Sequence, residues 1–126
     1  MRTENELATI IVDCCFKIHK SLGPGLLESV YEETLAYELI TRGVSFKRQH
    51  GIGVTYENIK MDLGFCPDLI VEDKVIIEIK SVEAIAPVHH KQLLTYLRLT
   101  GIKLGLLVNF NEVLIKKGIQ RIVNGL

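Results

Sequence analysis

The hydrophobic pattern of the N-terminal third predicts two helices. Apolar residues recur at intervals of three and four over residues 5–20 and again over residues 26–42, which is the spacing of amphipathic helices. Gly23-Pro24-Gly25 separates the two runs, and Gly43 is expected to end the second helix. No strand precedes this turn and no GK[ST] sequence follows it, so we expect a helix connector and not a phosphate-binding loop.

From Val44 the apolar residues alternate with polar ones, which predicts strands. The turns between these strands are short, so the strands are expected to form an antiparallel meander. They are expected at residues 44–48, 52–56, 59–65, 69–71 and 75–79.

The C-terminal part of the chain predicts a crossover connection. Residues 89–100 return to helical spacing, and residues 103–110 form a strong strand. A helix between two strands is typical of a right-handed crossover, so this strand is expected to lie parallel to residues 75–79. A short strand at 113–115 and a weak helical end at 119–123 complete the prediction. The fold class is therefore α/β, with a central mixed sheet flanked by helices.

Charged residues interrupt two of the most apolar strands. Asp68 directly precedes one strand, and Glu78 and Lys80 lie on the next. An unpaired charge in an apolar layer costs several kcal/mol, so these residues need a partner. Residues two apart on a strand share a face, so Glu78 and Lys80 point the same way. Two explanations remain open: a metal ion that bridges Asp68 and Glu78, or a buried ion pair between Glu78 and Lys80.

The turn at residues 72–74 decides whether the two acids meet. If the loop has an odd number of residues centred on Asp73, Asp68 lies opposite Glu78 and Ile70 lies opposite Ile76. An even loop would place Asp68 and Glu78 on different faces. The odd register also gathers the apolar residues of both strands on one face, which the hydrophobic pattern favours.

Composition narrows the class of protein. The 126 residues, 48% of them hydrophobic, are enough for one domain with its own core, spanning residues 1–126. The odd set of Cys14, Cys15 and Cys66 has no CxxC spacing, which favours reduced thiols in the cytoplasm over disulfides or a zinc site. No signal peptide or membrane span is expected. Fifteen basic and fifteen acidic residues give zero net charge, so nucleic acid would have to bind local basic patches.

Two helical faces carry further polar residues. Glu28 and Tyr31 share a stripe of the second helix with Glu32, and a third acid there could reach a metal ion. Gln92 and Tyr96 lie four apart on the late helix and share a face. Spacing alone favours ordinary roles for all of them, as solvated residues or as a polar border beside the leucine stripe.

Six short motifs follow one another along the chain: Gly25-Leu26-Leu27-Glu28-Ser29-Val30-Tyr31, Pro67-Asp68, Glu78-Ile79-Lys80, the QLLTYL sequence at residues 92–97, the GLLVNF sequence at residues 105–110 and the GIQR sequence at residues 118–121. In this order they resemble the GxxExxY family, which is similar to the PD-(D/E)XK nuclease superfamily and its RecB-like members. The resemblance covers nearly the whole chain and implies a restriction-endonuclease-like fold.

This resemblance implies a nuclease that hydrolyses phosphodiester bonds in nucleic acid, more readily DNA than RNA, with Mg or Mn as cofactor. A homodimer would let so small a domain reach two strands. The alternatives are a nuclease-fold module that binds nucleic acid or a protein without cutting, and a purely structural network of the same charged residues. The implied roles are Lys80, Asp68 and Glu78 in catalysis, Glu28, Asp68 and Glu78 as metal ligands, and Gln92, Tyr96 and Tyr31 in substrate binding.

Overall fold

The computed structural model describes residues 1–126, and its centre is a five-stranded mixed sheet in the order β1-β4-β5-β6-β7. Strands β5 and β6 are parallel, and the other neighbours are antiparallel. The strands of this sheet are β1 (Phe46–Arg48), β4 (Leu69–Val71), β5 (Val75–Lys80), β6 (Leu104–Asn109) and β7 (Ile119–Val123).

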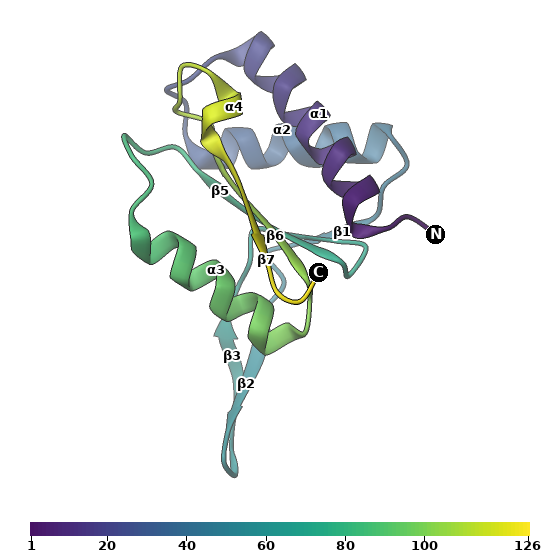
Figure 1. Ribbon diagram of the computed structural model, residues 1–126, viewed down its shortest axis with the longest axis vertical. Helices are drawn as coiled ribbons and strands as arrows, with labels where there is room; N and C mark the ends of the chain where they lie inside the picture. The colour runs from purple at the N-terminus through teal and green to yellow at the C-terminus, as the bar shows by residue number, and fades with distance from the viewer.

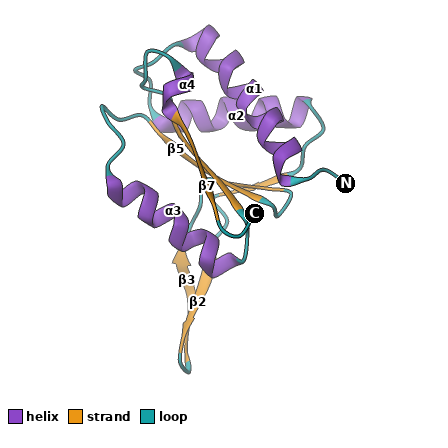
Figure 2. Cartoon of the chain, viewed as in Figure 1, coloured by secondary structure: helices purple, strands orange, loops and turns teal.

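Helices cover both faces of the sheet, and a hairpin projects from the body (Figures 1 and 2). Helices α1 and α2 lie on one face and α3 lies on the other, while the hairpin of β2 and β3 forms a separate two-stranded sheet, here called the arm. None of the helices is both long and apolar enough to span a membrane. The remaining elements are α1 (Glu4–Leu22), α2 (Glu28–Thr41), β2 (Ile52–Tyr56), β3 (Ile59–Phe65), α3 (Pro87–Thr100) and α4 (Ile115–Gly118).

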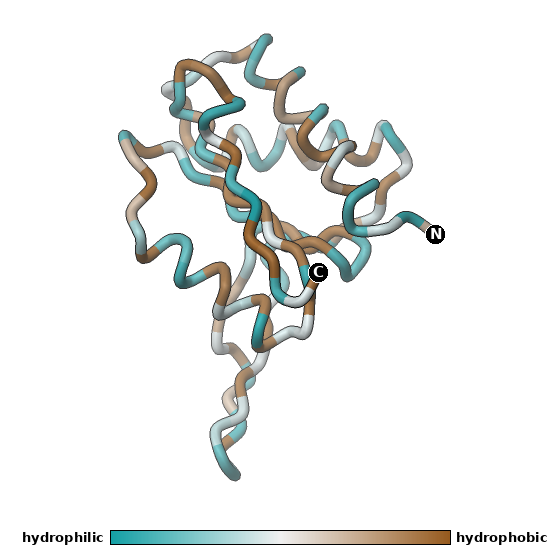
Figure 3. The backbone as a smooth tube through the Cα atoms, viewed as in Figure 1, coloured by the Kyte–Doolittle hydropathy of each residue, from teal (hydrophilic) through white to brown (hydrophobic).

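The alternation along β5 divides the core into two layers, one on each face of the sheet. Val75, Ile77 and Ile79 pack with α1 and α2 in the larger cluster, whereas Ile76 packs with Leu93 and other residues of α3 in the smaller one. The tube coloured by hydropathy shows the apolar strands crossing the centre of the body (Figure 3). Glu78 lies on the same face as Ile76, so it points towards the α3 side.

The predicted register between β4 and β5 is confirmed. Ile70 lies opposite Ile76 and Val71 lies opposite Val75, so the connecting turn has three residues centred on Asp73. The backbone φ of Asp73 is +55°, in the left-handed region that aspartate tolerates better than most residues. The parallel pairing of residues 75–80 with residues 104–109 is confirmed as well.

Three details of the predicted topology are wrong. Residues 113–115 are not a strand, since helix α4 begins at Ile115, and residues 119–123 are not helical but form edge strand β7. The apolar spacing of such a short segment fits either structure, and pairing with β6 decides it. The strands also do not form one continuous meander, because β1 pairs directly with β4 and the arm leaves the sheet between them.

Candidate active site

The two strand acids meet at the end of β5, as the odd register requires. The backbone N–H of Asp68 donates to Oε1 of Glu78 at 3.2 Å, and the backbone N–H of Ile79 donates to Oδ2 of Asp68 at 2.7 Å. Each carboxylate therefore anchors the backbone of the opposite strand. The site lies where the carboxyl ends of parallel strands β5 and β6 come together, which is the usual place for ligands in sheets of this kind.

Burial makes both carboxyl groups reluctant to ionise. Glu78 is 7% exposed, and its burial, together with repulsion from the charge of Asp68, raises its pKa from 4.5 to about 8. Burial also raises the pKa of Asp68, although hydrogen bonds from Ile79 and Gln49 act in the opposite direction. Near neutral pH the pair therefore retains a proton unless a cation compensates its charge.

Lys80 is half-buried beside these acids but forms no ion pair with either. The six ion pairs of the structure all involve other residues. The alternative of a buried ion pair between Glu78 and Lys80 is therefore wrong. The positive charge of Lys80 nevertheless opposes the rise in pKa that burial causes at Glu78 and Asp68, so the ammonium group lies within electrostatic reach of both acids.

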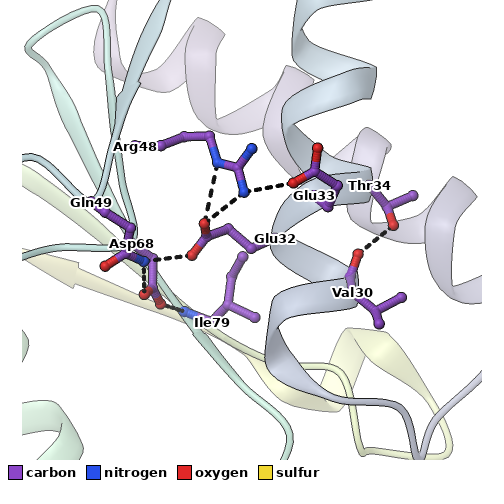
Figure 4. A network of polar contacts seen from close by, with 8 residues as sticks. All are labelled: Val30, Glu32, Glu33, Thr34, Arg48, Gln49, Asp68 and Ile79. Atoms are coloured by element: carbon purple, nitrogen blue, oxygen red, sulfur yellow. Dashed lines mark hydrogen bonds and ion pairs between the residues drawn. The ribbon is translucent and has the colours of Figure 1, made fainter.

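A hydrogen-bond network from α2 and β1 holds Asp68 in place (Figure 4). The side-chain Nε2 of Gln49 donates to Oδ1 of Asp68 at 3.0 Å and to Oε1 of Glu32 at 2.7 Å. Arg48 donates to Oε2 of Glu32 through Nε at 3.2 Å and Nη2 at 2.9 Å, and also pairs with Glu33. The charge of Glu32 is thus compensated by Arg48, and the side-chain amide of Gln49 links Glu32 to Asp68.

Gln49 also adopts an unusual backbone conformation. Its φ is +47°, and its backbone N–H donates to the carbonyl oxygen of Asp68 at 3.0 Å. A non-glycine residue with positive φ is uncommon and is often found where function constrains the chain. The sequence analysis missed Gln49 and Arg48, since no spacing along the chain relates residues 48–49 to Asp68.

Glu28 does not join the acid pair. It begins helix α2, and its Oε2 accepts a hydrogen bond of 3.2 Å from the backbone N–H of Ser81, directly after Lys80. No group of three His, Cys, Asp or Glu side chains in the chain is arranged to hold a metal ion. The structure therefore brings Asp68 and Glu78 together and places Glu28 at the border of the same region.

Tyr31 lies in the core, which corrects the expectation that it contacts substrate. Its ring is fully buried and stacks on Phe110 with centroids 4.4 Å apart. Its hydroxyl donates to the carbonyl oxygen of Gly23 at 2.6 Å and accepts from the N–H of Leu26 at 3.1 Å. The tyrosine of the GLLESVY sequence therefore holds the Gly-Pro-Gly turn against the sheet.

Helix α3 places Tyr96 close to the acids. Burial, followed by the charges of Glu78 and Asp68, raises the pKa of Tyr96. Its ring stacks on Phe65 at the base of the arm, with centroids 4.2 Å apart. Gln92, one turn earlier, is exposed. Both residues lie on the α3 side of the sheet, and the sequence analysis missed Phe65.

The donor atoms of the acid pair suit a hard divalent cation. Asp68 and Glu78 offer carboxylate oxygens from adjacent strands, and Oε2 of Glu78 accepts no hydrogen bond from the protein. Two carboxylates are enough for Mg²⁺ or Mn²⁺ when water and a substrate phosphate complete the coordination. A cation would also replace the proton that the raised pKa values imply, so the residues present fit such an ion.

Comparison with known proteins agrees with this geometry. A family model described as the PD-(D/E)XK nuclease superfamily matches residues 5–122, and this superfamily generally uses divalent metals. No curated protein and no solved structure matches the chain. The α/β architecture, with its mixed five-stranded sheet, is consistent with a restriction-endonuclease-like fold. A match over nearly the full length shows that the chain belongs to the PD-(D/E)XK nuclease superfamily.

Proposed function

We propose that the protein is a divalent-metal-dependent nuclease that hydrolyses phosphodiester bonds in nucleic acid, with DNA as the preferred substrate. The observation that carries the proposal is that Asp68 and Glu78 meet on strands joined by the three-residue turn. Lys80 lies on the same face and forms no ion pair. Buried carboxylates with raised pKa values and no cationic partner are costly for stability, which favours a functional role.

Each residue has a distinct part in the proposed reaction. Asp68 and Glu78 would hold the cation, Mg²⁺ or Mn²⁺, which when bound acts as a Lewis acid towards water and phosphate. Lys80 would orient the attacking water and stabilise the negative charge that builds on the phosphoryl oxygens. The water oxygen bonds to phosphorus as a phosphorus–oxygen ester bond breaks, which yields one phosphate end and one hydroxyl end.

Other residues would shape the same site. Gln49 would keep the carboxylate of Asp68 oriented, since its amide bonds Asp68 directly. Tyr96 and Gln92 on α3 would contact the substrate, and Glu28 would act as an outer acid beside the end of β5. The three free thiols fit a reducing compartment, so we propose a cytoplasmic location.

The experiment is a cleavage assay with labelled duplex, single-stranded and branched DNA and with single-stranded RNA, in Mg²⁺, Mn²⁺ or EDTA. We expect cleavage that requires metal and that falls by roughly 100-fold or more in Lys80→Ala. Lys103→Ala, which removes an exposed lysine before β6, is the matched control and should cleave like the wild type. Absence of cleavage on every substrate, or equal cleavage by Lys80→Ala, would contradict the proposal.

The zero net charge favours a second candidate, a nuclease-fold module that binds nucleic acid or a protein partner without cutting. The two candidates differ in metal binding. Calorimetric titration of the folded protein with Mn²⁺ should show binding that Glu78→Gln loses if the protein is a nuclease. A folded protein that binds no Mn²⁺ would favour the second candidate.

A further inference from the structure

Helix α2 is apolar on two opposite sides, although only one side is covered. Its inner side, with Tyr31, Leu35 and Leu39, is fully buried against the sheet and α1. Large apolar residues on the opposite side are 39% to 73% exposed. Exposed apolar residues that gather on one surface often mark a site where another molecule binds. The outer face of α2 consists of Leu27, Val30, Thr34, Tyr37, Ile40 and Thr41.

The two threonine hydroxyls on the outer face of α2 are satisfied within the helix. The hydroxyl of Thr34 donates to the carbonyl oxygen of Val30 at 2.5 Å, as Figure 4 shows, and the hydroxyl of Thr41 donates to the backbone carbonyl oxygen of Tyr37 at 3.0 Å. These bonds leave the two threonines without an unmet hydroxyl donor. Burying this surface would therefore leave few polar groups unpaired.

The charges beside the outer face of α2 are also paired within the chain. Glu33 pairs with Arg48 at 2.9 Å, and Glu38 pairs with Lys17 at 2.9 Å. A partner could therefore cover this face without isolating a charge, and it needs no complementary charge of its own. These observations favour a protein surface whose own charges are likewise paired over nucleic acid, whose phosphates require basic residues.

We propose that the occupant is a second copy of this chain, with α2 packed antiparallel against α2 of its partner around a two-fold axis. If the axis passes midway between Thr34 and Tyr37, Tyr37 faces the partner's Thr34, and Val30 faces the partner's Thr41. The larger residues of each protomer then lie opposite the threonines of the other. This is the self-complementary pattern that an interface with two-fold symmetry requires.

The area of the outer face of α2 is enough for a reversible dimer. Leu27, Val30, Tyr37 and Ile40 are 73%, 39%, 65% and 67% exposed. With about 100 Å² for an aliphatic side chain and about 200 Å² for tyrosine, they offer roughly 300 Å² of apolar surface per protomer. Apolar atoms make up about 65% of a typical homodimer interface. If the apolar surfaces of both protomers are buried, the total interface area is therefore about 1,000 Å². This is about the lower limit for specific interfaces, so we expect a weak, reversible dimer.

The arm is the competing apolar surface. Tyr56 lies opposite Ile59, and Met61 lies opposite Val54, so one face of the hairpin is apolar and largely uncovered. This face has no small residues to receive large ones from a second copy. The charges of Glu57, Lys60 and Asp62 on the arm also have no ion-pair partners, whereas every charge beside the outer face of α2 does.

Two tyrosines allow a matched test of these surfaces. Tyr37 on α2 and Tyr56 on the arm are both 65% exposed, so replacing either by lysine should leave the fold intact. Sedimentation velocity would be measured across the micromolar range in EDTA and reducing agent, without nucleic acid. We expect the wild type and Tyr56→Lys to dimerise with rising concentration and Tyr37→Lys to remain monomeric, with circular dichroism confirming the fold of each.

A second variant of the same face keeps the test valid if Tyr37→Lys fails to fold. Ile40→Lys changes another exposed residue of the same face and should also remain monomeric. The proposal is overturned if the wild type is monomeric throughout, if both α2 variants dimerise like the wild type, or if only Tyr56→Lys loses the dimer. The measurement requires neither metal nor cleavage, so its outcome is independent of the proposed nuclease function.

Discussion

Replacing Glu78 by glutamine should stabilise the metal-free protein. Glu78 is 7% exposed, and its burial and the neighbouring charge of Asp68 raise the pKa of its carboxyl group to about 8. Glutamine has nearly the same shape but carries no charge, and its oxygen can still accept the hydrogen bond from the N–H of Asp68. The substitution therefore removes the cost of ionising a buried acid while keeping its main contact.

The size of this effect follows from proton linkage. Glu78 ionises near its ordinary pKa of 4.5 in the unfolded chain and near 8 in the folded protein. Between these values the folded state binds more protons, so the free energy of unfolding of the wild type falls as the pH rises. At about 1.4 kcal/mol per pH unit, the loss reaches roughly 3 kcal/mol at pH 7. Glu78→Gln should be more stable by about that amount at pH 7 and by almost nothing below pH 4.5.

Urea unfolding followed by circular dichroism in EDTA, at acidic, neutral and mildly alkaline pH, measures this difference. Glu57→Gln, in the exposed turn of the arm, is the control and should change stability by less than about 0.5 kcal/mol. Adding Mg²⁺ or Mn²⁺ should stabilise the wild type and not Glu78→Gln. If Glu78→Gln is instead less stable than the wild type at neutral pH without metal, the acid belongs to a structural network and the reasoning is refuted.

Three further substitutions test the packing and the site. Gln49→Ala should weaken metal binding by roughly 10-fold, measured by calorimetry, because Asp68 loses its orienting amide; unchanged affinity would show that the contact is dispensable. Tyr31→Phe should lower the free energy of unfolding by about 1–2 kcal/mol, since two hydrogen bonds disappear, and a neutral result in urea unfolding would contradict that role. Gly105→Ala would place its Cβ 2.9 Å from the side chain of Leu93 and should lower the free energy of unfolding by about 1–3 kcal/mol. The double variant with Leu93→Ala should lose less stability than the sum of the two single variants, because the smaller side chain removes the clash. Strict additivity would argue against the steric clash.

Several parts of the site could be predicted from the sequence because they depend on neighbouring strands with a short turn. Alternation along residues 69–71 and 75–80 identifies which residues share a face of the sheet, and the position of Asp73 sets the parity of the turn. The meeting of Asp68 with Glu78 follows from these two local facts. The crossover helix likewise predicted that β6 lies parallel to β5.

Other parts of the site depend on the path of the chain between distant elements. Gln49 reaches Asp68 only because the arm leaves the sheet and lets β1 pair with β4. Glu28 and Tyr31 share a helical stripe in the sequence, yet Glu28 bonds the backbone of Ser81 while Tyr31 enters the core. Helical spacing says which residues share a side and not what covers that side.

The sequence by itself determined the two helices, the apolar strands and the face that Asp68, Glu78 and Lys80 share, because period and turn parity are local properties of the chain. Only the tertiary structure decided that Lys80 forms no ion pair, that Glu32 and Gln49 support Asp68, and that residues 119–123 form the edge strand β7. The physical reason is that long-range pairing and burial depend on which surfaces the folded chain brings together, and a weak local preference yields to those contacts.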